Sequence, residues 1–326
     1  MKHPKFKNES KTLKVLITCG GGIFGAITAY LLDSLNQTVY PDTGFDTSKF
    51  IDVYGGTSIG GVNALFLALH GDPHFLVEAY HDGAHKIFKQ DILTPFKLVN
   101  GNKYPDSNID PFLKKYLGGL SKYDPIKIFD LDEKVVVPTV DFKEEDPFII
   151  TNLKPEDTEK NLPVWLAGGA TCAAPTYFDP RKWGRRILID GGIIENVPVM
   201  CTVTSIISAW EDIDYGDIDM FVVGTGVKYP PADRTFEKVA NFHIIDWLTE
   251  FLIPFVTTSN ETCSQYWGKK LRLHYYDVFN PIPIEGSLDD YSLLYPSSTY
   301  PDGYLYTITR PYIKEFAERW QKFIEA

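Results

Sequence analysis

The sequence lacks two features that would place it across a membrane or on a nucleic acid. Its 326 residues contain no uncharged apolar run approaching the roughly 18 to 20 residues that cross a bilayer. There is no basic block and the formal net charge is −11, whereas nucleic-acid binding depends on Lys and Arg contacts to phosphate. We therefore expect neither a membrane-spanning protein nor a nucleic-acid partner.

A secretory signal and a cysteine framework are also missing. Residues 1–11 carry scattered lysines but no apolar segment, so no export signal is expected there. The four cysteines are widely spaced, which fits neither a metal site nor a disulfide framework. They are Cys19, Cys172, Cys201 and Cys263. We expect free thiols in a cytoplasmic protein.

Repeats, low-complexity tracts and long polar linkers are absent, so one continuous domain is the simplest organisation. The 44% of hydrophobic residues are enough for a large core. We expect a single domain over residues 13–326, with its core at about 13–230. Residues 231–326 are predicted to be a helical and loop extension packed on that core, and residues 1–12 an N-terminal tail.

Apolar runs typical of strands alternate with helical patterns along the chain. The predicted strands cover residues 14–18, 50–54, 134–142, 147–153, 186–190 and 218–226. Helical patterns occupy residues 23–35, 62–71, 162–175 and 310–326. This alternation predicts an α/β fold in which a mostly parallel sheet has helices on both faces. Functional groups in such folds lie at the carboxyl ends of strands.

The stretch "GTSIG" has glycines two residues before and after Ser58. It fits the G-x-S-x-G pattern of a nucleophile elbow, with a predicted strand before it and a predicted helix after it. At such a turn Ser58 stands at the apex in a strained conformation, and Gly56 and Gly60 remove side chains that would collide. The alternative is an ordinary glycine-rich turn in which Ser58 caps the helix.

A second glycine run, "CGGGIFG", also joins a predicted strand to a helix. Gly20, Gly22 and Gly25 match the G-x-G-x-x-G fingerprint of dinucleotide-binding proteins. That interpretation requires an acidic residue at the end of the second strand, and Asp46, at the right distance, lies in a stretch of turn composition. The other use of such a loop is an oxyanion hole, in which successive amides point at one position.

A serine nucleophile needs a base, and the sequence offers two kinds. His243 and His274 follow Ser58 in the order of an α/β-hydrolase, but they lie in a predicted helix and a predicted strand rather than in tight loops. Asp190 ends an apolar strand, and the two glycines after it let the chain turn away from its carboxylate. We favour Asp190 as the base and keep a histidine-dependent esterase as the alternative.

Together these pieces resemble the patatin-like phospholipase family, which has a G-G-G-x-[R/K]-G loop, a G-x-S-x-G serine and a D-G-[G/A] aspartate in this order. The likeness covers about residues 13–230. The matching residues are Gly20, Gly21, Gly22 and Gly25, then Gly56, Ser58 and Gly60, then Asp190, Gly191 and Gly192. Two departures are Cys19, where many members have Asp, and Phe24, where the loop usually has a basic residue. The backbone amides of the loop are kept.

The resemblance implies a three-layer α/β/α fold with helical insertions and a lipid acyl hydrolase that needs no metal or cofactor. Ser58 is then the nucleophile and Asp190 its general base, without a histidine. The oxyanion hole is formed by amides of the glycine loop, Gly20 to Gly22, with Ile59. The expected substrate is a fatty acyl ester at a lipid or membrane surface, which the protein contacts peripherally.

Two segments are candidates for lipid contact. Residues 242–258 are rich in aromatic and aliphatic side chains, among them Trp247 and Phe251, and fit either a lid or an amphipathic core helix. Residues 181–186 form a local basic patch in which Arg185 and Arg186 could meet lipid phosphate, or stand on a solvated hairpin turn. The sequence leaves the head group, the acyl length, a regulatory ligand and the oligomeric state open.

Overall fold

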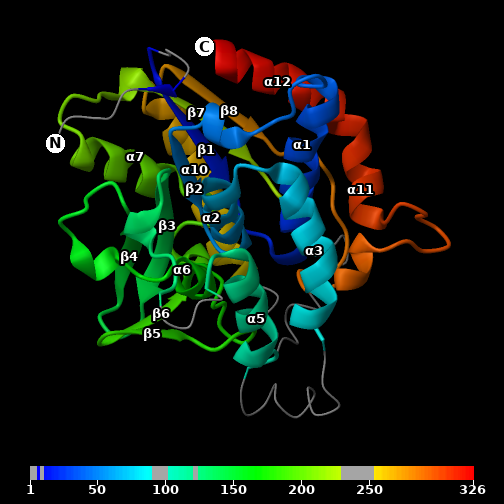
Figure 1. The fold of residues 1–326 in the computed structure, drawn as a ribbon, viewed down its shortest axis with the longest axis horizontal. Coiled ribbons are helices and arrows are strands. Elements are labelled where there is room, and N and C mark those ends of the chain that lie inside the picture. Colours follow the sequence, from blue (N-terminus) through cyan, green and yellow to red (C-terminus); the bar gives the residue numbers. More distant parts are fainter. Residues whose placement is uncertain (1–5, 8–10, 90–101, 120–123, 229–252) are drawn as a thin grey trace, which may run out of the picture.

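The computed structural model describes residues 6–7, 11–89, 102–119, 124–228 and 253–326, with residues 253–261 described in their backbone alone (Figure 1). Within these residues an eight-stranded sheet has the order β5-β6-β3-β2-β1-β7-β8, and β4 pairs with β3. The strands are β1 (Leu13–Thr18), β2 (Val53–Gly56), β3 (Lys134–Asp141), β4 (Asp146–Thr151), β5 (Arg181–Trp183), β6 (Arg186–Asp190), β7 (Ile218–Val223) and β8 (Tyr275–Phe279).

The sheet has a parallel part and an antiparallel corner. β3, β2, β1, β7 and β8 run parallel to one another in this order, as the alternating pattern predicts. β4 and β6 are antiparallel to β3, and β5 is antiparallel to β6. Every residue of β1 and β7 is buried, because helices cover both faces of a parallel sheet.

The helices cover the sheet in two layers and form two separate cores. Figure 1 shows α1, α11 and α12 on one side of the sheet and α7 on the other. Along β1, Leu16 points into the core beneath α1, α2 and α12, whereas Val15 and Ile17 point into the core beneath α7. The helices are α1 (Gly25–Thr38), α2 (Ile59–His70), α3 (Pro73–Ile87), α5 (Asp106–Tyr116), α6 (Val164–Thr171), α7 (Val199–Ala209), α10 (Ile253–Lys270), α11 (Tyr304–Thr309) and α12 (Ile313–Glu325). The chain therefore has the expected α/β/α architecture.

The C-terminal helix is amphipathic because of its sequence spacing. Phe316, Trp320 and Phe323 are fully buried, and their rings lie 5.4 to 6.0 Å from the ring of Phe221 in β7. Its first turn differs from the prediction, since Arg310–Tyr312 form a 3-10 turn before α12 begins at Ile313. None of the described helices has the length and hydrophobicity needed to cross a bilayer.

Two strand boundaries also differ from the sequence-based prediction. The strand expected at residues 50–54 is displaced to Val53–Gly56, because Phe50 terminates a 3-10 turn over Thr47–Lys49. Asp46 caps that turn by accepting from the Ser48 amide at 2.9 Å. The strand expected around His274 begins one residue later, at Tyr275. The strands predicted at residues 134–142 and 147–153 are confirmed as the antiparallel pair β3 and β4.

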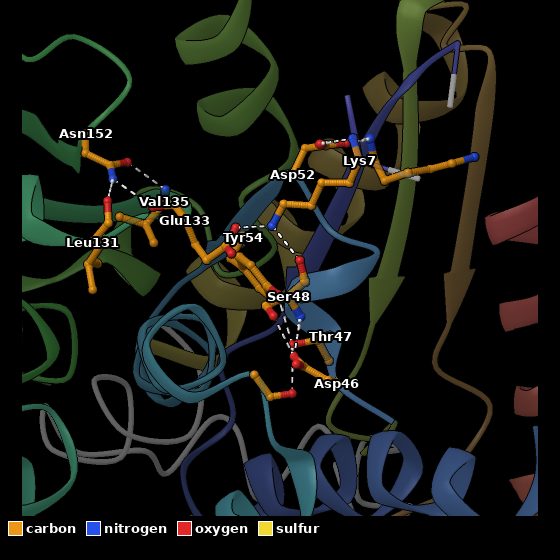
Figure 2. A network of polar contacts seen from close by, with 12 residues as sticks. Lys7, Asp46, Thr47, Ser48, Asp52, Tyr54, Leu131, Glu133, Val135 and Asn152 are labelled. Atoms are coloured by element: carbon orange, nitrogen blue, oxygen red, sulfur yellow. Dashed lines mark hydrogen bonds and ion pairs between the residues drawn. The ribbon is translucent and has the colours of Figure 1, made fainter. Parts of the chain in front are cut away.

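Polar contacts join the starts of the parallel strands to the N-terminal residues (Figure 2). The Lys7 amide donates to Asp52 Oδ1 at 3.0 Å, and the Lys14 amide of β1 donates to Asp52 Oδ2 at 2.8 Å. The Lys7 ammonium pairs with Glu133 and donates to the Ser48 carbonyl at 2.6 Å. Lys7 lies in the segment predicted to be a tail and is nevertheless bound to the amino ends of the sheet.

Candidate active site

Ser58 occupies a strained turn between β2 and α2. Its φ of 55° and ψ of −130° lie outside the regions that residues with a side chain prefer. A Cβ on Gly56 would lie 2.2 Å from the Gly60 carbonyl oxygen, and a Cβ on Gly60 would lie 2.2 Å from that of Thr18. Both positions therefore require glycine. The Ser58 amide donates to Thr171 Oγ1 at 2.9 Å, which helps to hold the turn.

The turn places the Ser58 hydroxyl against the carboxylate of Asp190, 132 positions along the chain. Ser58 Oγ donates to Asp190 Oδ2 at 2.7 Å, and the Gly192 amide donates to Oδ1 at 2.7 Å. Asp190 is the last residue of β6 and pairs with Thr139 near the carboxyl end of β3. A Cβ on Gly191 would lie 2.2 Å from the Pro138 carbonyl oxygen, so the turn after Asp190 also requires glycine.

Asp190 is a buried carboxyl group without a cation beside it. Its exposed fraction is 5%, and none of the ion pairs among the described residues involves it. Burial raises the pKa of Asp190 to about 6, although the hydrogen bonds from Gly192 and Ser58 act in the opposite direction. A carboxyl group with this pKa can both accept and return a proton near neutral pH.

The glycine loop lies beside the pair, but its amides differ in availability. Gly21, Gly22, Ser58 and Ile59 line the same cavity, and no hydrogen bond found among the described residues engages the amide of Gly21, Gly22 or Ile59. The Gly20 amide, which we also expected in the oxyanion hole, donates to the Asn196 carbonyl at 3.1 Å. Gly20 is therefore a poor donor to a substrate, because its hydrogen is already used.

A cavity of about 440 Å³ opens beside Ser58 and has mostly apolar walls. Its wall along α2 is made by Ile59, Val62, Asn63 and Phe66, which share one face of the helix. Aliphatic and aromatic side chains from α3, α5 and the segment after α6 complete it; they are Leu76, Tyr80, Ile87, Ile109, Phe112, Leu113, Tyr116, Tyr177 and Phe178. The volume and the apolar lining suit a hydrocarbon chain.

The alternative bases and binding sites are not brought to this cavity. His274 Nδ1 lies 2.7 Å from Asp219 Oδ1 at the opposite end of the sheet, and no histidine of the described ranges lines the cavity. His243 lies outside the described residues. Asp46 caps a 3-10 turn instead of ending the second strand, so it does not occupy the position of a ribose-binding acid.

The residues predicted to contact lipid are only partly placed. Trp247 and Phe251 lie outside the described residues. Arg185 is exposed in the turn of the β5–β6 hairpin, which agrees with the hairpin interpretation of this segment. The Arg186 guanidinium lies between the carboxylates of Asp141 and Glu159. Lipid contact by these four residues stays a prediction.

Several residues around Ser58 and Asp190 were not predicted from the sequence. The Asn63 side chain donates to the Gly25 carbonyl at 3.2 Å and accepts from the Tyr80 hydroxyl at 2.8 Å, which ties α2 to the start of α1 and to α3. Thr225 donates to the Gly20 carbonyl at 2.8 Å. A polar residue at an apolar position of a helix, such as Asn63, is the one available hint.

Comparisons with known proteins identify the family of the chain. A family-wide sequence profile described as Patatin-like phospholipase matches residues 16–202. The chain is 28% identical to a cGAMP-activated phospholipase of Escherichia coli (strain TW11681), over 67% of this chain and 63% of the relative. It is 29% identical to Patatin-like protein 2 of Arabidopsis thaliana, over 76% of this chain and 69% of the relative. The aligned region thus spans less than two thirds of the bacterial relative.

Among solved structures, VipD from Legionella pneumophila is similar with a TM-score of 0.45 and 11% identity, over 97% of this chain and 67% of that one.

Proposed function

The chain belongs to the patatin-like phospholipase family, and from this premise we propose that it hydrolyses fatty acyl esters of lipids through a Ser58–Asp190 dyad. The observation that carries the proposal is the 2.7 Å hydrogen bond from Ser58 Oγ to Asp190 Oδ2. The bond lies at the wall of an apolar cavity that suits an acyl chain. No cation of the described residues pairs with this carboxylate, so it is available to accept the serine proton.

The reaction runs in two halves. Ser58 Oγ attacks the ester carbonyl carbon while its proton passes to Asp190 Oδ2, and the negative oxygen is held by the amides of Gly21 and Gly22 with Ile59. The tetrahedral species collapses, the ester C–O bond breaks, and the leaving alcohol takes the proton from Asp190. Water then attacks the acyl-serine, its proton passes through Asp190 to Ser58 Oγ, and the fatty acid leaves.

The packing of the glycine loop favours an oxyanion hole rather than a dinucleotide-binding site. A Cβ on Gly20 would lie 2.1 Å from Asn196 Oδ1, and a Cβ on Gly21 would lie 2.3 Å from Thr225 Oγ1. These glycines therefore allow the loop to approach other protein segments closely. In a dinucleotide-binding loop the same absence of side chains serves the approach of a pyrophosphate.

Product analysis of a mixed lipid extract tests the proposal. Wild-type protein is expected to release free fatty acid and lysolipid, which mass spectrometry identifies together with the preferred acyl length. Ser58→Ala is expected to release none. Ser208→Ala removes an exposed hydroxyl on α7 and serves as the matched control, with activity equal to wild type. Fatty acid release by Ser58→Ala at the wild-type rate would exclude Ser58 as the nucleophile, and it would overturn both the dyad and the histidine-dependent alternative.

A further inference from the structure

The segment Ser287–Asp289 lies directly on the glycine loop. The Ile23 amide donates to the Leu288 carbonyl at 2.7 Å. The same carbonyl oxygen would lie 2.3 Å from a Cβ on Gly22, whose φ of +57° also favours glycine. Leu288 lines the cavity together with Ser58. A segment far beyond residues 16–202, which match the family profile, therefore shapes the loop that supplies the amide donors.

The Leu288 side chain is too exposed to anchor this segment. Its exposed fraction is 46%, so it buries little of the apolar area that would hold it in place. Figure 1 shows the chain after β8, in orange, passing beside α1 on its way to α11. The Leu288 carbonyl is therefore held by contacts of neighbouring residues, among them a buried polar contact.

That contact is made by the Asp289 carboxylate, which is 7% exposed. Its Oδ2 accepts from the Tyr104 hydroxyl at 2.6 Å and pairs with the Lys103 ammonium, and its Oδ1 accepts from Ser287 Oγ at 2.5 Å. Burial by itself would raise the pKa of Asp289, but the hydrogen bonds from Lys103, Ser287 and Tyr104 outweigh burial and lower it. The carboxylate is thus held ionised.

The partners of Asp289 are themselves fixed to the cavity wall. The Lys103 amide donates to the Thr176 carbonyl at 2.9 Å, and the Tyr104 amide donates to the Tyr177 carbonyl at 2.8 Å. Tyr104 is fully buried and Tyr177 lines the cavity. Asp289 consequently connects the glycine loop on one side with the acyl-binding wall on the other.

We propose that Asp289 is a positioning residue for the hydrolysis, because it holds the Leu288 carbonyl that orients the Gly21–Gly22 amides toward the developing oxyanion. The proposal rests on the proposed function of the Ser58–Asp190 dyad. Since oxyanion stabilisation acts on the transition state, loosening this contact lowers kcat and leaves KM nearly unchanged.

The test compares Asp289→Asn with Asp290→Asn, the same substitution at the next residue. Asp290 caps the 3-10 turn over Tyr291–Leu294, a role that Asn fills equally well. Asp289→Asn is expected to lower kcat on a p-nitrophenyl ester by about tenfold to a hundredfold, which is the cost of a small misplacement of a catalytic group. Affinity for an alkyl boronic acid, which mimics the tetrahedral species, should fall in proportion. Affinity for the fatty acid product should not.

A milder pair of variants covers the case in which Asp289→Asn fails to fold. Lys103→Met removes the cation and should lower kcat in the same direction, whereas Lys103→Arg keeps the charge and should restore it. An unchanged kcat in folded Asp289→Asn, or equal activities of the two Lys103 variants, would overturn the proposal. So would a rise in KM at constant kcat. If wild type and Asp290→Asn also fail to react with a fluorophosphonate, the proposed function itself is wrong.

Discussion

Two buried aspartates lie at opposite ends of the same sheet and differ in the partners that surround them. Asp219, at the amino end of β7, pairs with the Lys14 ammonium at 2.6 Å and with His274 Nδ1 at 2.7 Å. Asp190, at the carboxyl end of β6, accepts only from a hydroxyl and a backbone amide. Asp219 thus has a cationic partner, Lys14, and Asp190 has none among the described residues.

The difference separates a structural carboxylate from one that can transfer a proton. A buried carboxylate beside a lysine keeps its charge and its place, because removing either partner leaves an unpaired charge. Without a cation, burial raises the pKa of Asp190 to about 6, into the range in which a base is useful. The amino end of the sheet repeats the paired arrangement at Lys7 and Glu133 (Figure 2).

The largest effect is expected from removing the unpaired carboxylate. Asp190→Asn should lower kcat by roughly 10³- to 10⁴-fold, because the amide cannot take the proton from Ser58. The variant should be at least as stable as wild type at pH 8, since it no longer buries a charge. Steady-state kinetics on a soluble ester and thermal unfolding measure both quantities. Activity within tenfold of wild type would remove Asp190 from the mechanism.

The difference in stability between wild type and Asp190→Asn should depend on pH. Because the folded-state pKa of Asp190 is raised from 3.8 to about 6, the native state holds this proton more tightly than the unfolded chain. The stabilisation that the protonated Asp190 carboxyl group contributes is present below about pH 4 and is lost as the pH rises through 6. Wild type should therefore lose stability relative to Asp190→Asn between these values. A difference that is constant from pH 4 to 8 would contradict the pKa shift.

Replacing Asp219, the carboxylate paired with Lys14, is expected to lower stability and leave the activity unchanged. Asp219→Asn leaves the Lys14 cation buried without its partner, which should lower the free energy of unfolding by roughly 3 to 5 kcal/mol. The kcat of the folded fraction should not change, because Asp219 lies at the opposite end of the sheet. Denaturant unfolding and active-site titration separate the two quantities. A loss of kcat in folded protein would show that the two ends are coupled.

The smallest effect concerns pH and the alternative base. Asp190 must be ionised to accept a proton, so kcat/KM should rise about tenfold per unit below pH 6 and level off above it. His274→Ala should leave this profile unchanged, since His274 contacts Asp219 instead of Ser58. A pH–rate profile of the two proteins suffices. If His274→Ala abolishes activity in folded protein, the histidine-dependent esterase mechanism would be supported instead.

The sequence by itself determined three turns of the site: the elbow at Ser58, the glycine loop at residues 20–25 and the turn at Asp190. The glycine requirement at Gly56 arises from contact with Gly60, only four residues away, and the end of β6 at Asp190 is marked by the glycines that follow. Local clashes and turn chemistry act over a few residues, so their signal is complete within a short motif. The alternation of strands and helices predicted the parallel sheet for the same reason.

Only the tertiary structure decided which groups meet at the site. It placed a carboxylate against Ser58 across 132 positions, assigned the Gly20 amide to Asn196, and set the Leu288 carbonyl against Gly22. These contacts depend on how segments far apart in the chain approach each other. A hydrogen bond is determined within a few tenths of an ångström, and that closeness is produced by packing of the whole core, which no local pattern encodes.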